Sequence, residues 1–409
     1  MKTTRKNFLR TSAALATSLA IPSFSFANLG SSSNLKVNGS LKNRFDPWIE
    51  VLPESIRYNA GVLHNLSGKK PVIAVIKNNG YGLGDINAAK ILDDMPEIAG
   101  FAAVKTDVCI SVKEAGIKKP ILHMGMATDA DFYDLASNNV QLSIFDSRMR
   151  TLLESISKRT KRPVDTHLYI DTGMSRMGIP YHRAMPWIED IAKSKSINIL
   201  GSFMGFTEDP EFDKEQLKRL QNLNAKAASI KINMGRLHAA SSNAVYHFPE
   251  ASLDMIRPGI SLYGAYPTYP KKEEKIAPLK VGYRLNARVV RVEQLRTGDS
   301  VSYGGSYVAK SPVWIAALPI GHADGYLRKA TKGAKVLVNG NLYPVIGYVS
   351  ASHTIIELGN EPKVKVGDLA TLVGPDHPEI HPSHLSTITG TSVYDILMHM
   401  SARLPKIVL

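Results

Sequence analysis

The regular alternation of short β-branched runs with helix-like stretches constrains the fold of this chain most strongly. Between residues 70 and 265, stretches with apolar residues at helical spacing, such as 213–230, separate eight apolar runs. Strands separated by helices form parallel sheets, and eight of them close into a (β/α)8 barrel. We therefore predict an α/β protein with a TIM-type barrel over residues 43–280. The runs occupy residues 72–76, 100–104, 121–125, 140–145, 166–170, 197–203, 236–240 and 255–263.

The pattern of apolar residues changes after the charged run KKEEK at 271–275. Beyond it, apolar stretches such as 313–320 are separated by turn signals such as TGD at 297–299. A chain of 409 residues is too long for one small domain, and 44% apolar with 21% charged residues is typical of a globular enzyme. We predict a second, mostly β domain over residues 281–409.

The N-terminus has the pattern of a targeting signal. Four Lys or Arg residues within the first ten precede a mostly apolar run to residue 26 and the small residue Ala27. We predict a signal peptide over 1–27, a flexible lead-in over 28–42 and a periplasmic or secreted protein without a membrane span after signal removal. The segment TRKNFLR at 4–10 resembles a twin-arginine signal with Lys as its second basic residue, and an ordinary secretory signal is the alternative.

The positive charge of the chain does not point to nucleic acid. Loss of four positive residues with the signal lowers the net charge from +14 to +10, and the remaining Lys and Arg residues are scattered. A nucleic-acid site usually concentrates them on one face, so we expect no nucleic-acid partner. Cys109 is the only cysteine, which rules out an intramolecular disulfide.

Residues suited to catalysis and to phosphate binding follow the predicted strands. In barrel enzymes the reactive groups lie at these strand ends. Lys77 ends the first run and precedes a glycine-rich turn, a setting suited to a Schiff-base lysine. Ser242 follows the seventh run, and Gly259 and Ile260 lie in the eighth, beside Arg257. A hydroxyl and backbone N–H groups at that point predict a phosphate site.

Four segments resemble the alanine racemase family and occur in the family's order. They are IKNNGYG at 76–82, DTGMSRMG at 171–178, RPGISLYG at 257–264 and VSYG at 301–304. The resemblance covers residues 44–409. It implies pyridoxal 5′-phosphate as cofactor, an amino acid as substrate, and a homodimer in which each active site combines one barrel with the partner's β domain.

The resemblance also implies the catalytic pair. Lys77 would carry the cofactor and act as one base, and Tyr303 of the partner subunit would act as the opposite base. Racemisation needs bases on both faces of a planar carbanion, because the proton leaves one face and returns to the other.

The resemblance assigns binding roles to further residues. Arg257, supported by His238, would face the pyridine nitrogen and keep it unprotonated. Arg176 would orient the cofactor and the substrate. The phosphate would be held by Tyr81, Ser242, Gly259, Ile260 and Tyr394.

Four positions in three segments depart from the family pattern. Gly205 stands where a histidine is usual, and Ala351 and Ser352 replace a Met-Asp pair. Tyr169 stands where many members have a modified lysine that braces the arginine matching Arg176. The backbone N–H of Ala351 can still bind the substrate carboxylate. The lost bulk predicts a wider pocket that admits larger side chains than a methyl group.

Other interpretations remain open. The chain could be another amino-acid racemase, a lyase, or a cofactor-binding member with altered or lost activity. A non-catalytic single-barrel binder would lack the domain after residue 280. The segment HPEIHPSH at 377–384 has proline-broken histidine spacing, which favours a surface loop, and we predict no metal site.

Overall fold

The structure is a computed structural model that describes residues 44–146, 148–267 and 272–409. Contacts divide the chain after Arg44, and the fold below is that of the second unit, Phe45–Leu409. The signal peptide and the lead-in expected over 1–42 lie outside the described residues. No helix in the described ranges has the length and apolar character needed to cross a membrane.

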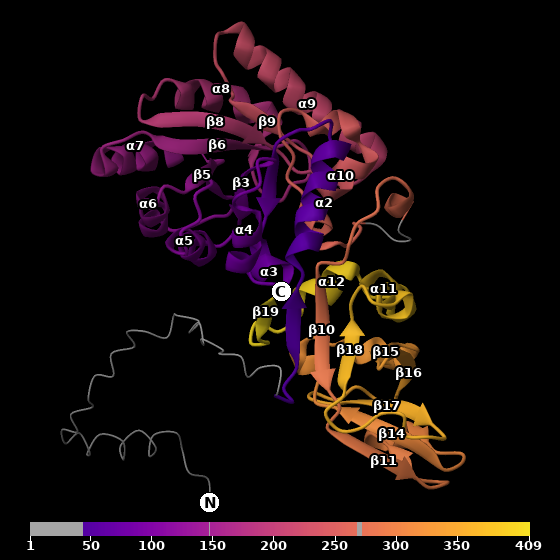
Figure 1. Cartoon of the computed structure of the whole chain (residues 1–409). Coiled ribbons are helices and arrows are strands. Elements are labelled where there is room, and N and C mark those ends of the chain that lie inside the picture. Colours follow the sequence, from indigo (N-terminus) through magenta and orange to yellow (C-terminus); the bar gives the residue numbers. More distant parts are fainter. Residues whose placement is uncertain (1–43, 147, 268–271) are drawn as a thin grey trace, which may run out of the picture. The chain divides into compact units, whose positions relative to one another are not determined.

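The first half of this unit is a parallel sheet surrounded by helices (Figure 1). Neighbouring strands follow the chain order, and the two-residue β7 (Ile179–Pro180) adds to β6 beside the main path. All four residues of β2 are buried, as expected for a strand covered on both faces. The strands are β2 (Val72–Val75), β3 (Ile98–Ala103), β4 (Ile121–His123), β5 (Gln141–Ile144), β6 (Val164–Asp171), β8 (Ile197–Phe203) and β9 (Arg236–His238).

The segment after β9 closes the barrel, so the predicted fold is confirmed. Met255 bridges to His238 and Ile256 bridges to Val72, which joins the two ends of the sheet. The eighth strand is shorter than expected over 255–263. Pro258 has no N–H to extend the ladder, and the chain turns into the 3₁₀ helix η3 (Ile260–Tyr263).

Helices cover the outside of the barrel, and local signals explain their ends. The Asp209 side chain accepts a hydrogen bond from the Phe212 N–H, and Pro210 occupies the first turn of α9. Thr128 and Asp131 form a capping box on α6. The elements are α2 (Pro53–Leu66), α3 (Lys77–Tyr81), α4 (Asp85–Leu92), α5 (Thr106–Glu114), α6 (Asp129–Ser137), α7 (Met149–Thr160), α8 (Tyr181–Ala192), α9 (Pro210–Ser229), α10 (Ser242–His247), η2 (Pro249–Ser252) and η4 (Lys272–Lys275).

The second half is built on a nine-stranded sheet, which confirms the mostly β domain. Its order is β11-β14-β17-β16-β15-β18-β10-β1-β19, and all neighbours are antiparallel except β1 and β19. The strands are β1 (Trp48–Val51), β10 (Tyr283–Arg288), β11 (Arg291–Leu295), β14 (Val313–Leu318), β15 (Lys335–Val338), β16 (Asn341–Ile346), β17 (Thr354–Gly359), β18 (Leu369–Val373) and β19 (Lys406–Val408). The hairpin strands are β12 (Ser300–Val301) and β13 (Tyr307–Val308), and the helices are η5 (Tyr303–Gly305), η6 (His322–Asp324), η7 (Arg328–Lys332), η8 (Pro378–Ile380), α11 (Pro382–Thr389) and α12 (Val393–Met398).

The position of β1 differs from the expected start of the barrel at residue 43. Ile49 in β1 pairs with Leu285 in β10 and with Lys406 in β19, so this strand belongs to the C-terminal sheet. Its partners lie more than two hundred residues away along the chain. Such pairing is decided by tertiary packing, which local sequence patterns do not encode. The barrel itself therefore begins with α2.

Candidate active site

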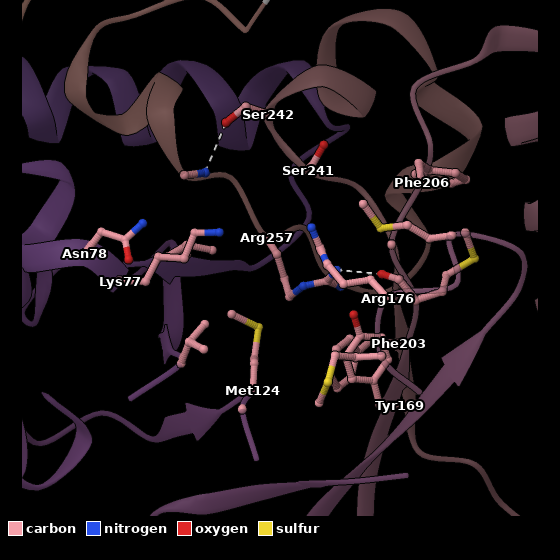
Figure 2. Close-up of a pocket in the computed structure, with 18 of the residues that line it drawn as sticks. Lys77, Asn78, Met124, Tyr169, Arg176, Phe203, Phe206, Ser241, Ser242 and Arg257 are labelled. Carbon is pink, nitrogen blue, oxygen red and sulfur yellow. Dashed lines mark hydrogen bonds between the residues drawn. The ribbon is translucent and has the colours of Figure 1, made fainter. Parts of the chain in front are cut away.

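A cavity of about 590 Å³ opens where the barrel strands end, and most of the predicted residues surround it. Figure 2 shows the side chains of Lys77, Arg176 and Arg257 gathered in this cavity. His238 lies behind Arg257, whereas Tyr303 and Ala351 do not line the cavity. The predicted residues that line it are Lys77, Tyr81, Arg176, Ser242, Arg257, Gly259, Ile260 and Tyr394.

Lys77 follows β2 and opens a left-handed turn. Residues 78–81 all have φ between 52° and 58°. Asparagine and glycine tolerate this region best, which explains the sequence NNG directly after the lysine. The turn also contacts the C-terminal domain, because a Cβ on Gly82 would lie 2.3 Å from the Leu397 carbonyl oxygen of α12. The sequence thereby holds Lys77 at the strand end and directs Tyr81 into the core.

The surroundings of Lys77 favour a neutral, nucleophilic amine. Burial lowers the pKa of its ammonium group, and the positive charges of Arg176 and Arg257 lower this pKa further. A lysine reacts with carbonyl compounds through its neutral form, so both effects activate it. The same cations make the cavity attractive to anions.

A hydrogen-bonded chain runs from Arg257 into the barrel core. Arg257 Nη1 donates to His238 Nδ1 at 2.9 Å, and His238 Nε2 lies 2.8 Å from His167 Nδ1. His167 Nε2 lies 3.1 Å from Gln141 Oε1. Because a guanidinium only donates, each histidine must accept at Nδ1 and donate from Nε2. The chain thus fixes both tautomers and ends on the Gln141 carbonyl oxygen.

This chain holds a charged arginine beside two neutral histidines. Burial lowers the pKa of His238, and nearby Arg257 and His167 lower it further. Burial, then Arg257, lowers the pKa of His167 to about 3. Burial lowers the pKa of Arg257 to about 10, so its guanidinium stays positive near neutral pH. Arg257 also donates to the Met204 carbonyl oxygen at 2.7 Å, which fixes the direction of its side chain.

Ser242 forms the centre of the predicted phosphate site. Its Oγ accepts hydrogen bonds from the N–H groups of Gly259 at 3.0 Å and Ser261 at 3.3 Å. The amide of Gly259 is therefore directed at Ser242 rather than at an anion. Because Oγ already accepts twice, the hydroxyl hydrogen of Ser242 can be donated to an anion in the cavity.

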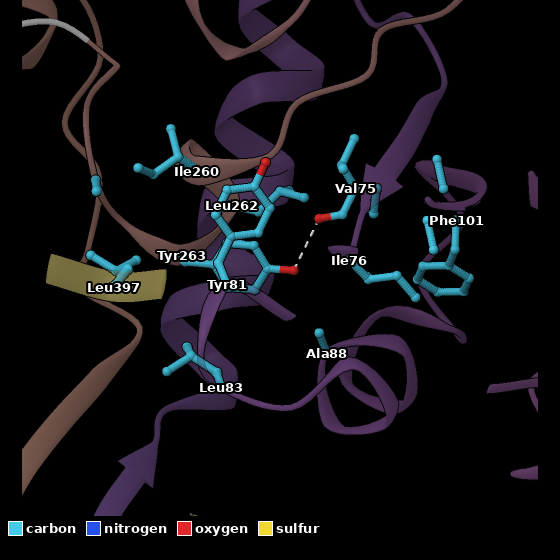
Figure 3. Close-up of a cluster of buried hydrophobic side chains, with 14 of the residues drawn as sticks. Val75, Ile76, Tyr81, Leu83, Ala88, Phe101, Ile260, Leu262, Tyr263 and Leu397 are labelled. Atoms are coloured by element: carbon cyan, nitrogen blue, oxygen red, sulfur yellow. Dashed lines mark hydrogen bonds between the residues drawn. The ribbon is translucent and has the colours of Figure 1, made fainter. Parts of the chain in front are cut away.

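Tyr81 lines the cavity beside Ser242 and Gly259. A Cβ on Gly259 would lie only 2.0 Å from the Tyr81 hydroxyl oxygen, so residue 259 must be glycine for the two segments to meet. The Tyr81 ring stacks on Tyr263 with centroids 5.0 Å apart (Figure 3). Tyr263 in turn donates to the Val75 carbonyl oxygen at 3.1 Å. Tyr394 reaches the cavity from α12 in the other domain.

Tyr169, one of the departures from the family pattern, belongs to an aromatic wall. Its ring stacks on Phe203 with centroids 4.2 Å apart and meets Phe145 edge-on at 6.3 Å. Among the described residues, Tyr169 lines the cavity without a hydrogen bond to Arg176, and its charge partly offsets the effect of burial on the pKa of Arg257. The wall thus supports the site both by packing and through Arg257, and the Phe203 ring centroid lies 5.0 Å from the guanidinium of Arg257.

Gly205 faces a flexible side chain. A Cβ at Gly205 would lie 3.1 Å from Met174 Sδ and 3.8 Å from Arg176 Nη2. The Gly205 carbonyl oxygen accepts a hydrogen bond from Gln216 on α9 at 3.1 Å. Methionine is unbranched and adapts its shape, so this wall can yield to a ligand. Five methionines line the cavity: Met124, Met126, Met174, Met177 and Met204.

Tyr303 lies at the exposed tip of the β12–β13 hairpin. Its side chain is 75% exposed, and Ser302 before it has a strained φ of 69°. Tyr307 at the hairpin base donates to Glu357 at 2.7 Å, which anchors the hairpin on the sheet. Ser302 Oγ donates to the Tyr348 carbonyl oxygen at 3.1 Å, so the hairpin lies beside the loop that carries exposed Ala351.

His167 and Gln141 were missed by the sequence reasoning. A usable signal existed for His167, because side chains two residues apart on a strand share a face. His167 therefore faces the barrel interior with Tyr169 on β6. No sequence signal indicated a role for Gln141, because a glutamine at the start of a strand is usually solvated.

The site fits an anionic carbonyl compound. Lys77 supplies the amine, Arg257 and Arg176 supply positive charge, and Ser242 supplies a hydroxyl, which lies above Lys77 in Figure 2. Together with the barrel and the β domain, this set defines an enzyme that binds a phosphorylated carbonyl cofactor on a strand-end lysine.

Comparison with known proteins gives the family. Residues 51–267 match the model of the alanine racemase N-terminal domain, and residues 282–408 match that of the C-terminal domain. An alanine racemase of Carboxydothermus hydrogenoformans is 34% identical over 370 residues, which are 88% of this chain and 98% of the relative.

Two solved structures have the same fold. Alanine racemase of Clostridium difficile superposes with a TM-score of 0.82 at 27% identity, covering 89% of this chain and 95% of that one. The Bacillus anthracis enzyme with bound L-Ala-P gives 0.80 at 26% identity, covering 90% and 95%.

The chain belongs to the alanine racemase family. It is therefore an isomerase whose cofactor is pyridoxal 5′-phosphate. Members of this family act on small molecules and are typically dimeric.

Proposed function

We propose that this chain interconverts the L and D forms of alanine and of amino acids with larger side chains. The observation that carries this proposal is the activated Lys77 in a cavity that also contains Gly205 and adaptable methionines. Narrow pockets discriminate by rigid contacts, whereas unbranched thioethers re-pack around different shapes.

The residues of the chain divide the binding work. Lys77 holds the cofactor, which when bound stabilises negative charge at the α-carbon of the substrate. Arg257, fixed in direction and positive near neutral pH, would face the pyridine nitrogen and keep it unprotonated. Ser242, Tyr81 and Tyr394, which all line the cavity, would hold the phosphate.

Two bases on opposite faces of the substrate move the proton. Lys77 removes or returns it on one face, and Tyr303 of the partner subunit acts on the other. The exposure of Tyr303 on an anchored hairpin supports this role, because a hairpin tip can enter a second copy's cavity. Arg176 binds the substrate carboxylate together with the backbone N–H of Ala351 of the partner subunit, which lies in the loop beside the Tyr303 hairpin.

A racemisation assay tests this function. Purified mature protein is given single L-amino acids, and circular dichroism or chiral chromatography follows the D form. We expect alanine and larger aliphatic substrates to racemise, and Lys77→Ala and Tyr303→Phe to reduce kcat by about a hundredfold or more. A yellow, cofactor-loaded wild type without activity would contradict the proposal, and activity confined to alanine would limit it to the narrower substrate.

We also propose that the enzyme works outside the cytoplasm. The basic and apolar pattern of residues 1–27 supports export. Cell fractionation of the full chain and of a chain starting at residue 28 tests this. Full-length protein in the periplasm or medium, with the shortened chain in the cytoplasm, is the expected result, and equal distribution would contradict export.

A further inference from the structure

Glu208 is the one carboxylate among the residues that line the cavity in the described part of the chain. The other charged lining residues are cations: Lys77, Lys105, Arg176 and Arg257. These cations suit the phosphate and the substrate carboxylate, but a carboxylate serves neither of those anions. A carboxylate in the cavity wall is suited to binding a positively charged group of a ligand instead.

The backbone around Glu208 is held firmly. Its N–H donates to Asp213 Oδ1 at 3.1 Å, and the N–H of Thr207 donates to Gln216 Oε1 at 3.0 Å. Asp213 and Gln216 lie on α9 and are buried, with 6% and 0% of their surfaces exposed. Glu208 itself has a φ of 67°, a strained conformation for a residue with a side chain. The fold thus fixes the point from which this carboxylate extends.

The carboxylate forms no ion pair in the described part of the chain, and His247 is the basic group that acts on it from a distance. No described Lys, Arg or His forms an ion pair with Glu208. Glu208 is exposed on one side, and its partial desolvation in the cavity wall raises its pKa, Asp213 raises it further, and His247 opposes the change. A cation brought beside this group would stabilise its ionised form.

The space beside Glu208 is suited to a long side chain. Gly205 lies three residues before it, and a side chain at that position would meet the Met174 thioether first, at 3.1 Å, and then Arg176 Nη2, at 3.8 Å. Phe206 and Met204 continue the apolar surface. An unbranched alkyl chain can pack along these groups while its end reaches a polar partner.

We propose that Glu208 binds the terminal cation of a basic amino acid, such as the side-chain ammonium of lysine or ornithine. This inference rests on the proposed function and names the substrate class of the same cavity. Without Glu208, a cationic side chain would meet only like charges on Lys105, Arg176 and Arg257, which would disfavour it. With Glu208, the side-chain cation gains a charge-assisted hydrogen bond.

The test compares L-lysine with L-norleucine, which has the same straight side chain without the amine. Dissociation constants come from the change in cofactor absorption of the holoenzyme, and kcat/KM comes from the racemisation assay. The variants are Glu208→Gln and, as matched control, Glu211→Gln. Glu211 is 84% exposed and pairs with Lys214 on the surface of α9.

We expect Glu208→Gln to weaken lysine binding and lower kcat/KM for lysine by about tenfold, with norleucine unchanged. Glu211→Gln should change neither. An equal effect of Glu208→Gln on both ligands, or none on lysine, would overturn the inference. If alanine is racemised but norleucine is neither bound nor turned over, the broader proposed function fails, and the response of lysine binding to Glu208→Gln still decides the role of Glu208.

Discussion

Gly259 and Tyr81 meet so closely that a single methyl group would not fit between them. A Cβ on Gly259 would lie 2.0 Å from the Tyr81 hydroxyl oxygen and 2.7 Å from Cζ. Tyr81 cannot easily retreat, because its ring is buried against Tyr263. This contact joins the turn after the first barrel strand to the segment that closes the barrel, beside the proposed phosphate site.

Gly259→Ala should therefore displace Tyr81. We expect weaker cofactor binding and a loss of about 2 kcal/mol in the free energy of unfolding, as for other overpacked cores. Absorbance titration with pyridoxal phosphate and urea unfolding measure the two effects. Gly61→Ala in α2 is the control, because nothing lies within 4 Å of its added Cβ. Equal cofactor affinity of wild type and Gly259→Ala would contradict the prediction that the added methyl group displaces Tyr81 from the cofactor site.

Gln141→Leu should disturb the site from the far end of the hydrogen-bonded chain. The change removes the acceptor for His167 Nε2–H, and an unsatisfied buried donor costs about 1–3 kcal/mol. It also frees His167, and through it His238, to adopt the other tautomer, so Arg257 loses its fixed acceptor. We expect a shifted cofactor absorption spectrum and a lower kcat. Gln141→Glu keeps an acceptor and should retain more of both, and the same spectrum in all three proteins would refute the coupling.

Acid should destabilise the protein through the buried histidines. The pKa of His167 is about 3 in the folded chain against 6.5 for the free group, so its contribution is complete above pH 6.5. As pH falls from 6.5 towards 3, only the unfolded chain takes up the proton, and stability falls by about 1.4 kcal/mol per pH unit for each such histidine. Urea unfolding between pH 7.5 and 5 should show a shallower decline for His167→Gln. An identical pH dependence would exclude His167 as a source of acid sensitivity.

Gly205→His should narrow the substrate range. The new ring would have to displace Met174, whose sulfur lies 3.1 Å from the position of the first added carbon. We expect kcat/KM for norleucine to fall by about tenfold relative to alanine, because small steric changes in a pocket are worth roughly 1–3 kcal/mol. Gly205→Ala should have an intermediate effect. A parallel fall for both substrates would show that residue 205 does not control size.

The sequence predicted the parts of this protein that depend on local pattern. The periodicity of apolar residues was sufficient to predict the barrel and α9. The segments around Lys77, Arg176 and Arg257 were sufficient to predict a set of residues that the fold places around one cavity. The position of β1 was not predictable, since its pairing with β10 depends on packing between distant segments. The eighth strand was overestimated because an apolar run does not distinguish a strand from the buried 3₁₀ helix η3.

The polar details of the site depend on geometry that no motif encodes. The link from His238 through His167 to Gln141 joins three separate strands of the barrel. From the sequence alone, Glu208 is indistinguishable from an ordinary acidic residue in a loop, and only the fold shows that it lines the cavity. Tyr303 is the opposite case, because its segment resembles the family while the single chain leaves it exposed.

In the proposed mechanism, each active site takes Lys77 from one subunit and Tyr303 from the partner subunit. The most direct test mixes inactive Lys77→Ala and Tyr303→Phe proteins under conditions that allow subunit exchange, and then measures racemisation. One of the two sites in each mixed dimer would have both bases, so random exchange should restore about a quarter of wild-type activity. Mixed dimers that form but remain inactive would contradict the shared active site.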